Sequence, residues 1–449
     1  MVARFFLFLH GMNEILIYVP KITNRVRYVF RLVFGNLLKI KYELTNDLDA
    51  FQSADKPKMM YGFKAHTDDI FFKANGLLFE RGVHSLEYNA FDFKGNKAFF
   101  QVFDEDAFLP FDVFAAIFFL VARYEEYLPF VSDVHGRFAA SLSMSSQWGI
   151  LEKPMVNIWA LEVKQIIQKR YPGFVFPQKN FRFIPTYDID SAWAFSQKGW
   201  LRNLGGFYKS LQSFRLGDMR QRARVLMGKE KDPFDTYDLQ LSYQKKYNLH
   251  PIYFILFGMY GRFDKNINFR NGRFRRLVKW LADYAEVGIH PSYHTVENPE
   301  LLKQELESLE ELLKTEITRS RQHFLRLNLP DTYQNLLEND ITDDYTMGFA
   351  ALPGFRAGIC DTYFFYDLEL DVETKLRLHP FAVMDGTLRD YLKLTPKDAM
   401  DRIKKLMDEV KKVDGTFISL WHNESLSDQK RWTGWRAVYE SLLMEATTH

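Results

Sequence analysis

The chain has 449 residues, of which 47% are hydrophobic and 26% charged, and its formal net charge at pH 7 is +2. This length allows two or three domains with large buried cores, and the near-neutral charge argues against a dedicated nucleic-acid-binding protein. The single cysteine, Cys360, excludes an internal disulfide and permits a reducing compartment. We therefore expect a cytoplasmic protein without a nucleic-acid partner.

Two apolar stretches were considered as targeting or membrane segments. The run at residues 5–9 is short, stops at His10 and lacks a small-residue cleavage site, so we interpret it as an extension before Met12 and not as a signal peptide. The stretch 113–122 has about half the length of a spanning helix and charged residues on both sides. No membrane span is expected.

The first part of the chain, residues 1–178, predicts a small α/β or α+β domain of unknown role. Strand-like segments lie at 14–19, 41–45, 58–63, 76–80 and 98–103, and helical periodicity covers 23–37, 110–127 and 154–170. Pro172 and Gly173 end the last of these helices. The domain boundary is therefore placed at residue 178.

Residues 179–449 alternate strand-like and helical segments, which is typical of parallel βα units. The predicted strands are 181–188, 252–257, 287–290, 321–327, 377–384 and 417–421, and the clearest helices are 299–314 and 396–411. The region 200–234, rich in Arg, Lys and Gly, interrupts this alternation. We interpret it as an insertion near the site, either a lid or a disordered loop.

Asp188 and Asp190 stand at the end of the first of these strands. Their carboxylates project to the same side, because side chains at positions i and i+2 of an extended chain share a face. Taken alone, Asp-x-Asp after a strand also occurs in phosphatases with an aspartyl nucleophile, in sugar-nucleotide transferases and in solvated turns. The function of this pair can be inferred only together with the residues that follow it.

His290 and His294 form a His-x-x-x-His segment after the strand 287–290. Both imidazoles can reach one point if a helical turn begins between them, and Pro291 suits the first position of such a turn. With Asp190 they would leave open positions on a divalent metal for a water molecule and a substrate oxygen. Two surface histidines are the alternative interpretation of this segment.

Two later residues complete the set. His422 follows the strand 417–421 and is a candidate general acid, or else a core histidine. Arg321 could pair with a carboxylate at the site and stabilise its ionised form, or else form a surface ion pair.

The order of these residues resembles the polysaccharide deacetylases of carbohydrate esterase family four, over residues 180–449. In that family a general-base Asp is followed by a metal-binding Asp, a His-x-x-x-His pair, an Arg-containing strand, an Asp-containing segment and a late Leu-x-His. The resemblance implies a distorted, incomplete (β/α) barrel of seven strands after the smaller first domain, with the site at the C-terminal ends of the strands. It also implies removal of acetyl groups from N-acetylated sugars.

The resemblance assigns a role to each matching residue. It implies that Asp188 is the base and Arg321 its partner, and that the metal ligands are Asp190, His290 and His294. It implies that His422 is the general acid, oriented by Asp344, for which Asp343 is nearly as good a candidate. The substrate contacts are assigned to Arg356, to the backbone N–H of Phe324 in an oxyanion hole, and to Trp421.

Two departures from the family pattern are visible. Ile189 separates the two aspartates, which are adjacent in the commonest form, and this places the chain in a subgroup. His323 stands where the family usually has proline, which weakens the assignment of the neighbouring Phe324.

The expected cofactor is a divalent metal, with Zn²⁺ favoured by two His and one Asp and with Co²⁺, Ni²⁺ or Fe²⁺ also compatible. The expected partner is an N-acylated carbohydrate, and the oligomeric state is not indicated. Two rival functions stay open: a metal-dependent hydrolase of a small or cyclic amide, and a non-catalytic carbohydrate-binding or assembly protein with a vestigial site. The intact residue set argues against the second rival.

Overall fold

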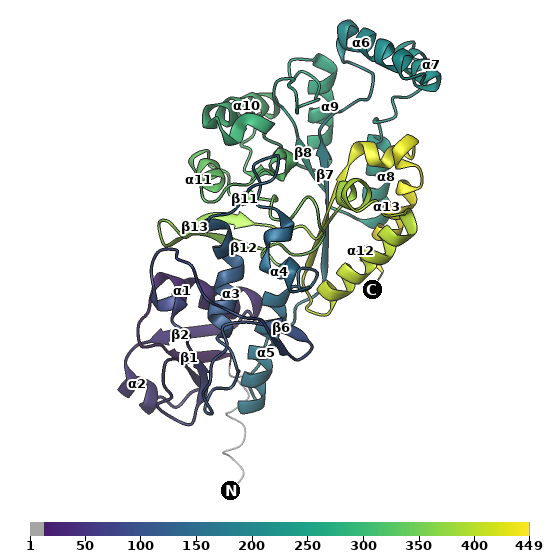
Figure 1. Cartoon of the computed structure of the whole chain (residues 1–449). Helices are drawn as coiled ribbons and strands as arrows, with labels where there is room; N and C mark the ends of the chain where they lie inside the picture. Colours follow the sequence, from purple (N-terminus) through teal and green to yellow (C-terminus); the bar gives the residue numbers. More distant parts are fainter. Residues whose placement is uncertain (1–12, 449) are drawn as a thin grey trace.

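The computed structural model describes residues 13–448, and Figure 1 shows their arrangement. The apolar run at residues 5–9, interpreted as an extension, lies outside this range. Two mainly parallel sheets with helices around them give a mixed α/β fold. None of the helices between residues 13 and 448 has both the length and the apolar character that a membrane crossing requires.

The first part of the chain is built on a parallel sheet with the strand order β2-β1-β3-β4. These strands are β1 (Glu14–Tyr18), β2 (Lys41–Thr45), β3 (Lys58–Gly62) and β4 (Ile70–Lys73), and a hairpin of β5 (Phe91–Phe93) and β6 (Asn96–Ala98) follows. The helices are α1 (Asn24–Phe30), extended by a π-helical segment (Arg31–Leu37), α2 (Leu48–Ser53), α3 (Val113–Val121), α4 (Met144–Gln147) and α5 (Met155–Arg170).

Two predicted elements of this part differ from the structure because the backbone turns left-handed within them. The segment 76–80 is a 3₁₀ turn and not a strand, because Gly76 adopts a φ of 116° at its start. The helix predicted over 110–127 stops at Val121, because Arg123 has a φ of 53° and a 3₁₀ turn follows it. A single left-handed residue interrupts the helical hydrogen-bond pattern, and apolar periodicity does not reveal it.

The second part contains the larger sheet. Among residues 179–448 this sheet has nine strands, in the order β12-β13-β11-β10-β9-β8-β7-β15-β14, and all adjacent pairs are parallel except β12 and β13. The strands are β7 (Arg182–Ile189), β8 (Ile252–Ile255), β9 (Glu286–Ile289), β10 (Arg319–Ser320), β11 (Asp343–Asp344), β12 (Tyr363–Asp367), β13 (Val372–Leu378), β14 (Val383–Met384) and β15 (Thr416–His422). The predicted barrel of seven strands is thus not confirmed.

An apolar cluster on the concave face shows that the sheet is curled. Tyr345, directly after β11, packs there with Phe254 of β8 and Ile418 of β15, although four strands separate β11 from β15 in the strand order. Helices surround the strands in Figure 1: α8 (Tyr237–Tyr247), α9 (Gly272–Ala282), α10 (Pro299–Leu313), α11 (Asp331–Glu338), α12 (Pro396–Lys411) and α13 (Trp435–Thr447). The C-terminal ends of the parallel strands therefore converge, as in a barrel.

Two predicted strands differ from those observed. No strand forms over 321–327, because β10 ends at Ser320 and a tight turn follows in which Phe324 and Leu325 have φ values of 59° and 53°. The strand predicted over 377–384 is split into β13 and β14 around Pro380, which has no N–H to donate to a neighbouring strand.

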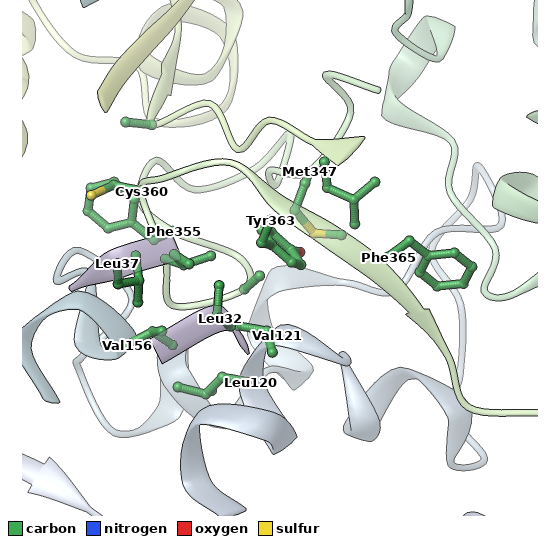
Figure 2. Close-up of a cluster of buried hydrophobic side chains, with 14 of the residues drawn as sticks. Leu32, Leu37, Leu120, Val121, Val156, Met347, Phe355, Cys360, Tyr363 and Phe365 are labelled. Atoms are coloured by element: carbon green, nitrogen blue, oxygen red, sulfur yellow. The ribbon is translucent and has the colours of Figure 1, made fainter. Parts of the chain in front are cut away.

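The two parts of the chain share one apolar core, seen in Figure 2. Leu32, Leu120 and Val156 from the first part lie beside Phe355 and Tyr363 from the second. Because this core is continuous across residue 178, the two parts are held together by apolar packing. The boundary at 178 stays a prediction from the sequence.

Candidate active site

Asp188 lies at the C-terminal end of β7 and is held by Arg321. Its Oδ1 atom accepts a hydrogen bond of 2.8 Å from Nη1 of Arg321, and both side chains are buried. The same Nη1 donates to Oγ1 of Thr186 at 2.7 Å, and Nε donates to the carbonyl of Tyr345 at 2.9 Å. The guanidinium is thereby fixed from three sides, and the Oδ2 atom of Asp188 faces His290.

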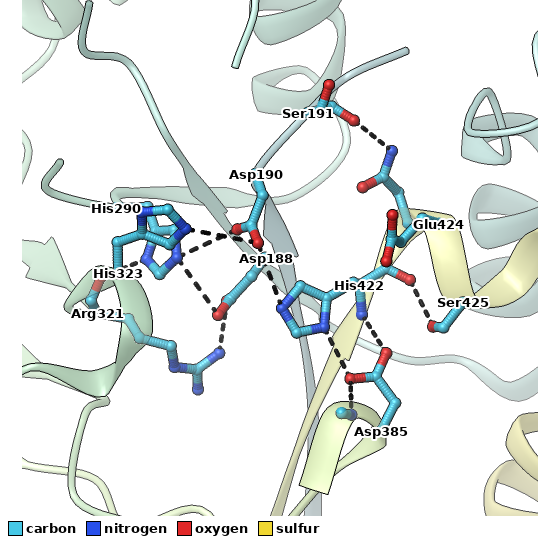
Figure 3. Close-up of polar contacts among 12 residues, drawn as sticks. Asp188, Asp190, Ser191, His290, Arg321, His323, Asp385, His422, Glu424 and Ser425 are labelled. Carbon is cyan, nitrogen blue, oxygen red and sulfur yellow. Dashed lines mark hydrogen bonds and ion pairs between the residues drawn. The ribbon is translucent and has the colours of Figure 1, made fainter. Parts of the chain in front are cut away.

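Asp190, His290 and His323 form a group whose ligand atoms all lie within 4.8 Å of one another. Figure 3 shows the two imidazoles directed at the carboxylate of Asp190, with His290 Nε2 at 3.3 Å and His323 Nε2 at 3.7 Å. Three such ligands with space beside them are the donor set of a catalytic divalent metal.

Each imidazole of this group is oriented through its other nitrogen. His290 Nδ1 lies 2.5 Å from the carbonyl oxygen of Arg321, and His323 Nδ1 lies 2.8 Å from Oδ1 of Asp264. Asp264 is in turn held by the backbone amide of Tyr293 at 2.9 Å. Such contacts set the tautomer and leave Nε2 of both histidines as the atom available for a metal.

His294 is not part of this group, contrary to the prediction. Its side chain is 61% exposed and lies beside Glu297, because the turn that follows Pro291 is a short 3₁₀ segment (Tyr293–Val296) that carries His294 away from His290. His323 occupies the position that was expected for His294. The signal was present in the sequence, two residues after Arg321, where His323 replaces the proline typical of the resembled family.

The surroundings of the Asp190 carboxylate fit a bound metal ion. The Oδ1 atom of Asp190 is buried and has no hydrogen-bond partner among the described residues. Burial would raise the pKa of Asp190, but His323, His422 and His290 outweigh it and lower this pKa well below its usual value. An ionised, unpaired carboxylate between two Nε2 atoms is the arrangement that a divalent cation satisfies.

His422 ends β15 and is oriented by Asp385, which was not predicted. Asp385 accepts hydrogen bonds from the backbone amide of His422 at 2.8 Å and from its Nδ1 at 2.7 Å. The parallel register pairs Met384, the last residue of β14, with Leu420, so Asp385 directly after β14 lies beside the end of β15. Burial would lower the pKa of His422, but Asp385 and Asp190 raise it well above its usual value.

Asp344 and Asp343, the predicted orienting residues, have other partners. Asp344 accepts hydrogen bonds from Ser320 Oγ at 2.8 Å and from the amide of Thr346 at 2.9 Å, inside the sheet. Asp343 lies 2.7 Å from His379 Nε2 through its Oδ1 atom. Neither residue orients His422, because β11 is separated from β15 by four strands, whereas β14 is directly adjacent to β15.

Three residues predicted to contact substrate have different environments. Arg356 is buried, and its Nε and Nη2 atoms donate to the carboxylate of Glu126 at 2.9 and 2.5 Å, so it joins the two parts of the chain and does not face the cavity. Trp421 is fully buried against Tyr439, because side chains alternate and His422 takes the opposite face. Phe324 does line the cavity, but its oxyanion role stays a prediction.

A cavity of about 230 Å³ opens above Asp188, Asp190 and His422. Apolar side chains form part of its wall, and polar and aromatic residues form the rest. The apolar members include Leu325, Met384 and Leu420, and the others include Asp390, Tyr391, Glu424, Arg431 and Trp432. Charged and polar side chains thus outnumber the apolar ones around this cavity, so it suits a polar ligand.

The first part of the chain also reaches this cavity, through Arg137. Its Nη1 atom donates to the carbonyl of Phe324 at 2.7 Å, and its Nε atom donates to Asp133 Oδ2 at 2.8 Å. Phe324 and the following Leu325 are both left-handed, which costs roughly 1–3 kcal/mol for each residue. Arg137 therefore fastens the strained turn that carries His323.

Comparisons with known proteins found one family model and several solved structures. The model of a family of unknown function (DUF7033) matches residues 15–172. No curated protein matches the chain. A structure from Mycobacterium smegmatis, assigned as a polysaccharide deacetylase, covers 61% of this chain and 86% of its own, with 16% sequence identity and a TM-score of 0.41.

Further solved structures have the same description. The polysaccharide deacetylase Bc1974 from Bacillus cereus covers 60% of this chain and 87% of its own, with 10% identity and a TM-score of 0.29. A mutant of BA3943, a pseudoenzyme of the CE4 family with restored activity, covers 59% of this chain and 62% of its own, with 13% identity and a TM-score of 0.27. Structures described as polysaccharide deacetylases are thus similar to this chain over about 60% of its length.

Proposed function

We propose that this protein is a metal-dependent hydrolase that removes N-acetyl or related acyl groups from a sugar or polysaccharide. One observation carries the proposal: the Asp188–Arg321 pair, the group of Asp190, His290 and His323, and the Asp385–His422 pair all meet at one cavity. A base, a metal-ligand set and an acid in one place are the three requirements of amide hydrolysis.

Asp190, His290 and His323 would hold the metal. A divalent ion bound there would polarise the scissile carbonyl and lower the pKa of a water molecule toward neutrality. Zn²⁺ is favoured by one carboxylate and two imidazoles, and Co²⁺, Ni²⁺ or Fe²⁺ also suit this set.

Asp188 acts as the general base. Arg321 donates a hydrogen bond to Oδ1 of Asp188 and leaves Oδ2 of Asp188 on the side of the cavity. This Oδ2 atom accepts the proton of the attacking water. The side chain cannot rotate freely because the guanidinium is itself fixed by Thr186 and Tyr345. The carbonyl carbon of the amide is thus attacked from the side of Asp188.

His422 acts as the general acid. Asp385 holds the proton on Nδ1 and supports the positive charge of the ring, so Nε2, on the side of Asp190, donates a proton to the departing nitrogen. An amine leaves only when it is protonated, and this step completes the release of acetate and a free amino sugar. The apolar wall formed by Leu325, Met384 and Leu420 limits the access of other water molecules.

A substrate panel tests the proposal. The full-length protein, reconstituted with zinc, is incubated with N-acetylated chito-oligosaccharides and with cyclic amides, and both acetate and free amine are measured. We expect acetate from the glycans in wild type and a loss of at least about a hundredfold in the Asp188→Asn variant. Cleavage of cyclic amides alone would favour the small-amide alternative, and no cleavage of either class would favour the vestigial site.

A further inference from the structure

The region 200–234 is not a disordered loop but contains a helical hairpin, and its role as a lid stays a prediction. Its helices are α6 (Gly199–Gln212) and α7 (Leu216–Leu226), which stand away from the barrel at the top of Figure 1. The hairpin follows directly after β7, the strand that ends in the candidate base.

The inner face of α6 is polar. Asn203 and Ser210 are its buried residues, and Nη1 of Arg222 on α7 donates to Oδ1 of Asn203 at 2.8 Å. Gly206 makes room for this contact, because a Cβ there would lie 2.5 Å from the guanidinium of Arg222. The two helices thus pack against each other through polar groups.

A second polar contact fixes the hairpin on the rest of the protein. The Nη1 atom of Arg202 donates to the carbonyl of Asn266 at 2.9 Å, and its guanidinium lies 3.9 Å from the centre of the Tyr260 ring. These contacts determine which side of α6 points outward.

The outward side of α6 is apolar. Trp200, Leu204, Tyr208 and Leu211 follow one another at helical spacing on one face, and they are 73%, 60%, 62% and 54% exposed. Phe214, in the turn between the helices, is 89% exposed. A surface helix normally buries its apolar face, so this inverted orientation indicates a surface that binds something else.

The hairpin is also strongly basic. Residues 198–231 contain nine lysines and arginines but two acidic residues, a net charge of +7, whereas the whole chain carries +2. Exposed basic side chains flank the apolar face; they include Lys209, Arg215, Arg220, Arg224 and Lys229. An excess of positive charge beside exposed aromatic and aliphatic groups is complementary to an anionic lipid surface.

We propose that this hairpin docks on an anionic lipid membrane. The apolar face of α6 inserts among the headgroups, where Trp and Tyr are favoured, and the basic side chains contact the lipid phosphates. A second copy of this chain is a less suitable occupant of the apolar face, because it would bring the same net charge of +7 against it.

Docking would bring the cavity to the membrane. Lys430, in the segment that leads to Trp432 of the cavity wall, has its Nζ atom 3.0 Å from Oδ1 of Asp218 on α7. A substrate carried on a lipid would then meet the cavity directly, and this statement about the substrate rests on the proposed function.

Vesicle flotation of the full-length protein tests the proposal. We expect flotation with vesicles of phosphatidylcholine and phosphatidylglycerol, little with phosphatidylcholine alone, and dissociation at high salt. The variant Trp200→Ser/Leu204→Ser/Leu211→Ser should bind at least tenfold more weakly. The matched control Phe103→Ser/Val175→Ser/Leu370→Ser removes apolar groups that are 83%, 54% and 64% exposed elsewhere, and it should float like wild type.

The proposal is overturned by no flotation of wild type, by equal flotation of the α6 variant, by weak flotation of the control, or by a wild-type dimer without vesicles that the α6 variant cannot form. The last outcome assigns the face to a second copy. The Asp188→Asn variant separates this proposal from the proposed function: flotation equal to wild type supports docking by the hairpin whatever the activity, and lost flotation contradicts it.

Discussion

Asp385 holds His422 through two hydrogen bonds, one from the backbone amide at 2.8 Å and one from Nδ1 at 2.7 Å. Both residues stand at the C-terminal ends of adjacent parallel strands, and the second hydrogen bond leaves Nε2 of His422 on the side of Asp190. Asp385 thereby sets the direction in which the general acid donates.

Replacement of Asp385 should impair catalysis without removing the metal. In the Asp385→Asn variant the amide can no longer support the charged imidazole, so kcat should fall by about a hundredfold or more. Steady-state kinetics and metal analysis of the same preparation measure both quantities. The control is Asp343→Asn, which changes a similar pair at 2.7 Å with His379 outside the cavity; equal losses in the two variants would contradict the role of Asp385.

Arg137 should affect the metal although it comes from the first part of the chain. It fastens the left-handed turn that carries His323, so in the Arg137→Ala variant this imidazole loses its fixed position. Loss of a supporting contact of this kind typically weakens metal binding by about 10–100-fold. A zinc titration with a competing chelator measures this change. Unchanged zinc affinity together with a raised KM would instead assign Arg137 to substrate contact.

Arg356 should matter for stability and not for catalysis. Its removal in Arg356→Ala leaves the buried Glu126 with one cationic partner, Arg123, and breaking a buried pair costs about 3–5 kcal/mol. Urea unfolding should show this loss, while kcat/KM of the folded fraction at low temperature should stay close to wild type. A stable variant with a specific loss of substrate affinity would restore the original substrate-binding prediction.

Glu305 should make the stability of the fold depend on pH. Burial raises its pKa to about 7, while its Oε2 atom accepts the amide of Ser292 at 2.9 Å. Between pH 4.5 and 7 the folded state therefore binds a proton that the unfolded state has lost. This contribution to stability, roughly 3 kcal/mol at most, is present at low pH and is lost as the pH rises toward 7.

The Glu305→Gln variant should remove this dependence of stability on pH. The side-chain amide of Gln can still accept the hydrogen bond from the backbone N–H of Ser292, and it carries no charge. Urea unfolding at pH 5, 6, 7 and 8 should give a flatter profile than wild type. Glu307→Gln, an exposed position of the same helix, is the control and should leave the profile unchanged. A profile for Glu305→Gln as steep as that of wild type would assign the dependence to another group.

Elements with strong local signals were predicted closely. The helix expected at 396–411 has these bounds, because Thr395 caps it by accepting the amide of Asp398 and Pro396 suits its first turn. The strand 41–45 is also observed as predicted. By contrast, the left-handed backbone at Arg123 and Phe324 depends on tertiary contacts, and no sequence pattern marked it.

The sequence predicted those site residues whose position depends only on the end of their own strand. Asp188, Asp190, His290, Arg321 and His422 all follow strands or end them, and the structure brings their side chains together. Asp385 follows a strand of two residues, and its nearness to His422 requires the register of β14 on β15. His323 requires the shape of a strained turn, and His294 was preferred because its spacing from His290 looked sufficient.

Metal content per chain tests the central claim most directly. Elemental mass spectrometry of wild type should find about one transition metal per chain after zinc reconstitution, and the His290→Ala and His323→Ala variants should lose it. His294→Ala, which changes an exposed imidazole in the same segment, should retain it. Equal metal in wild type and His323→Ala, or loss of metal in His294→Ala, would contradict the site described here.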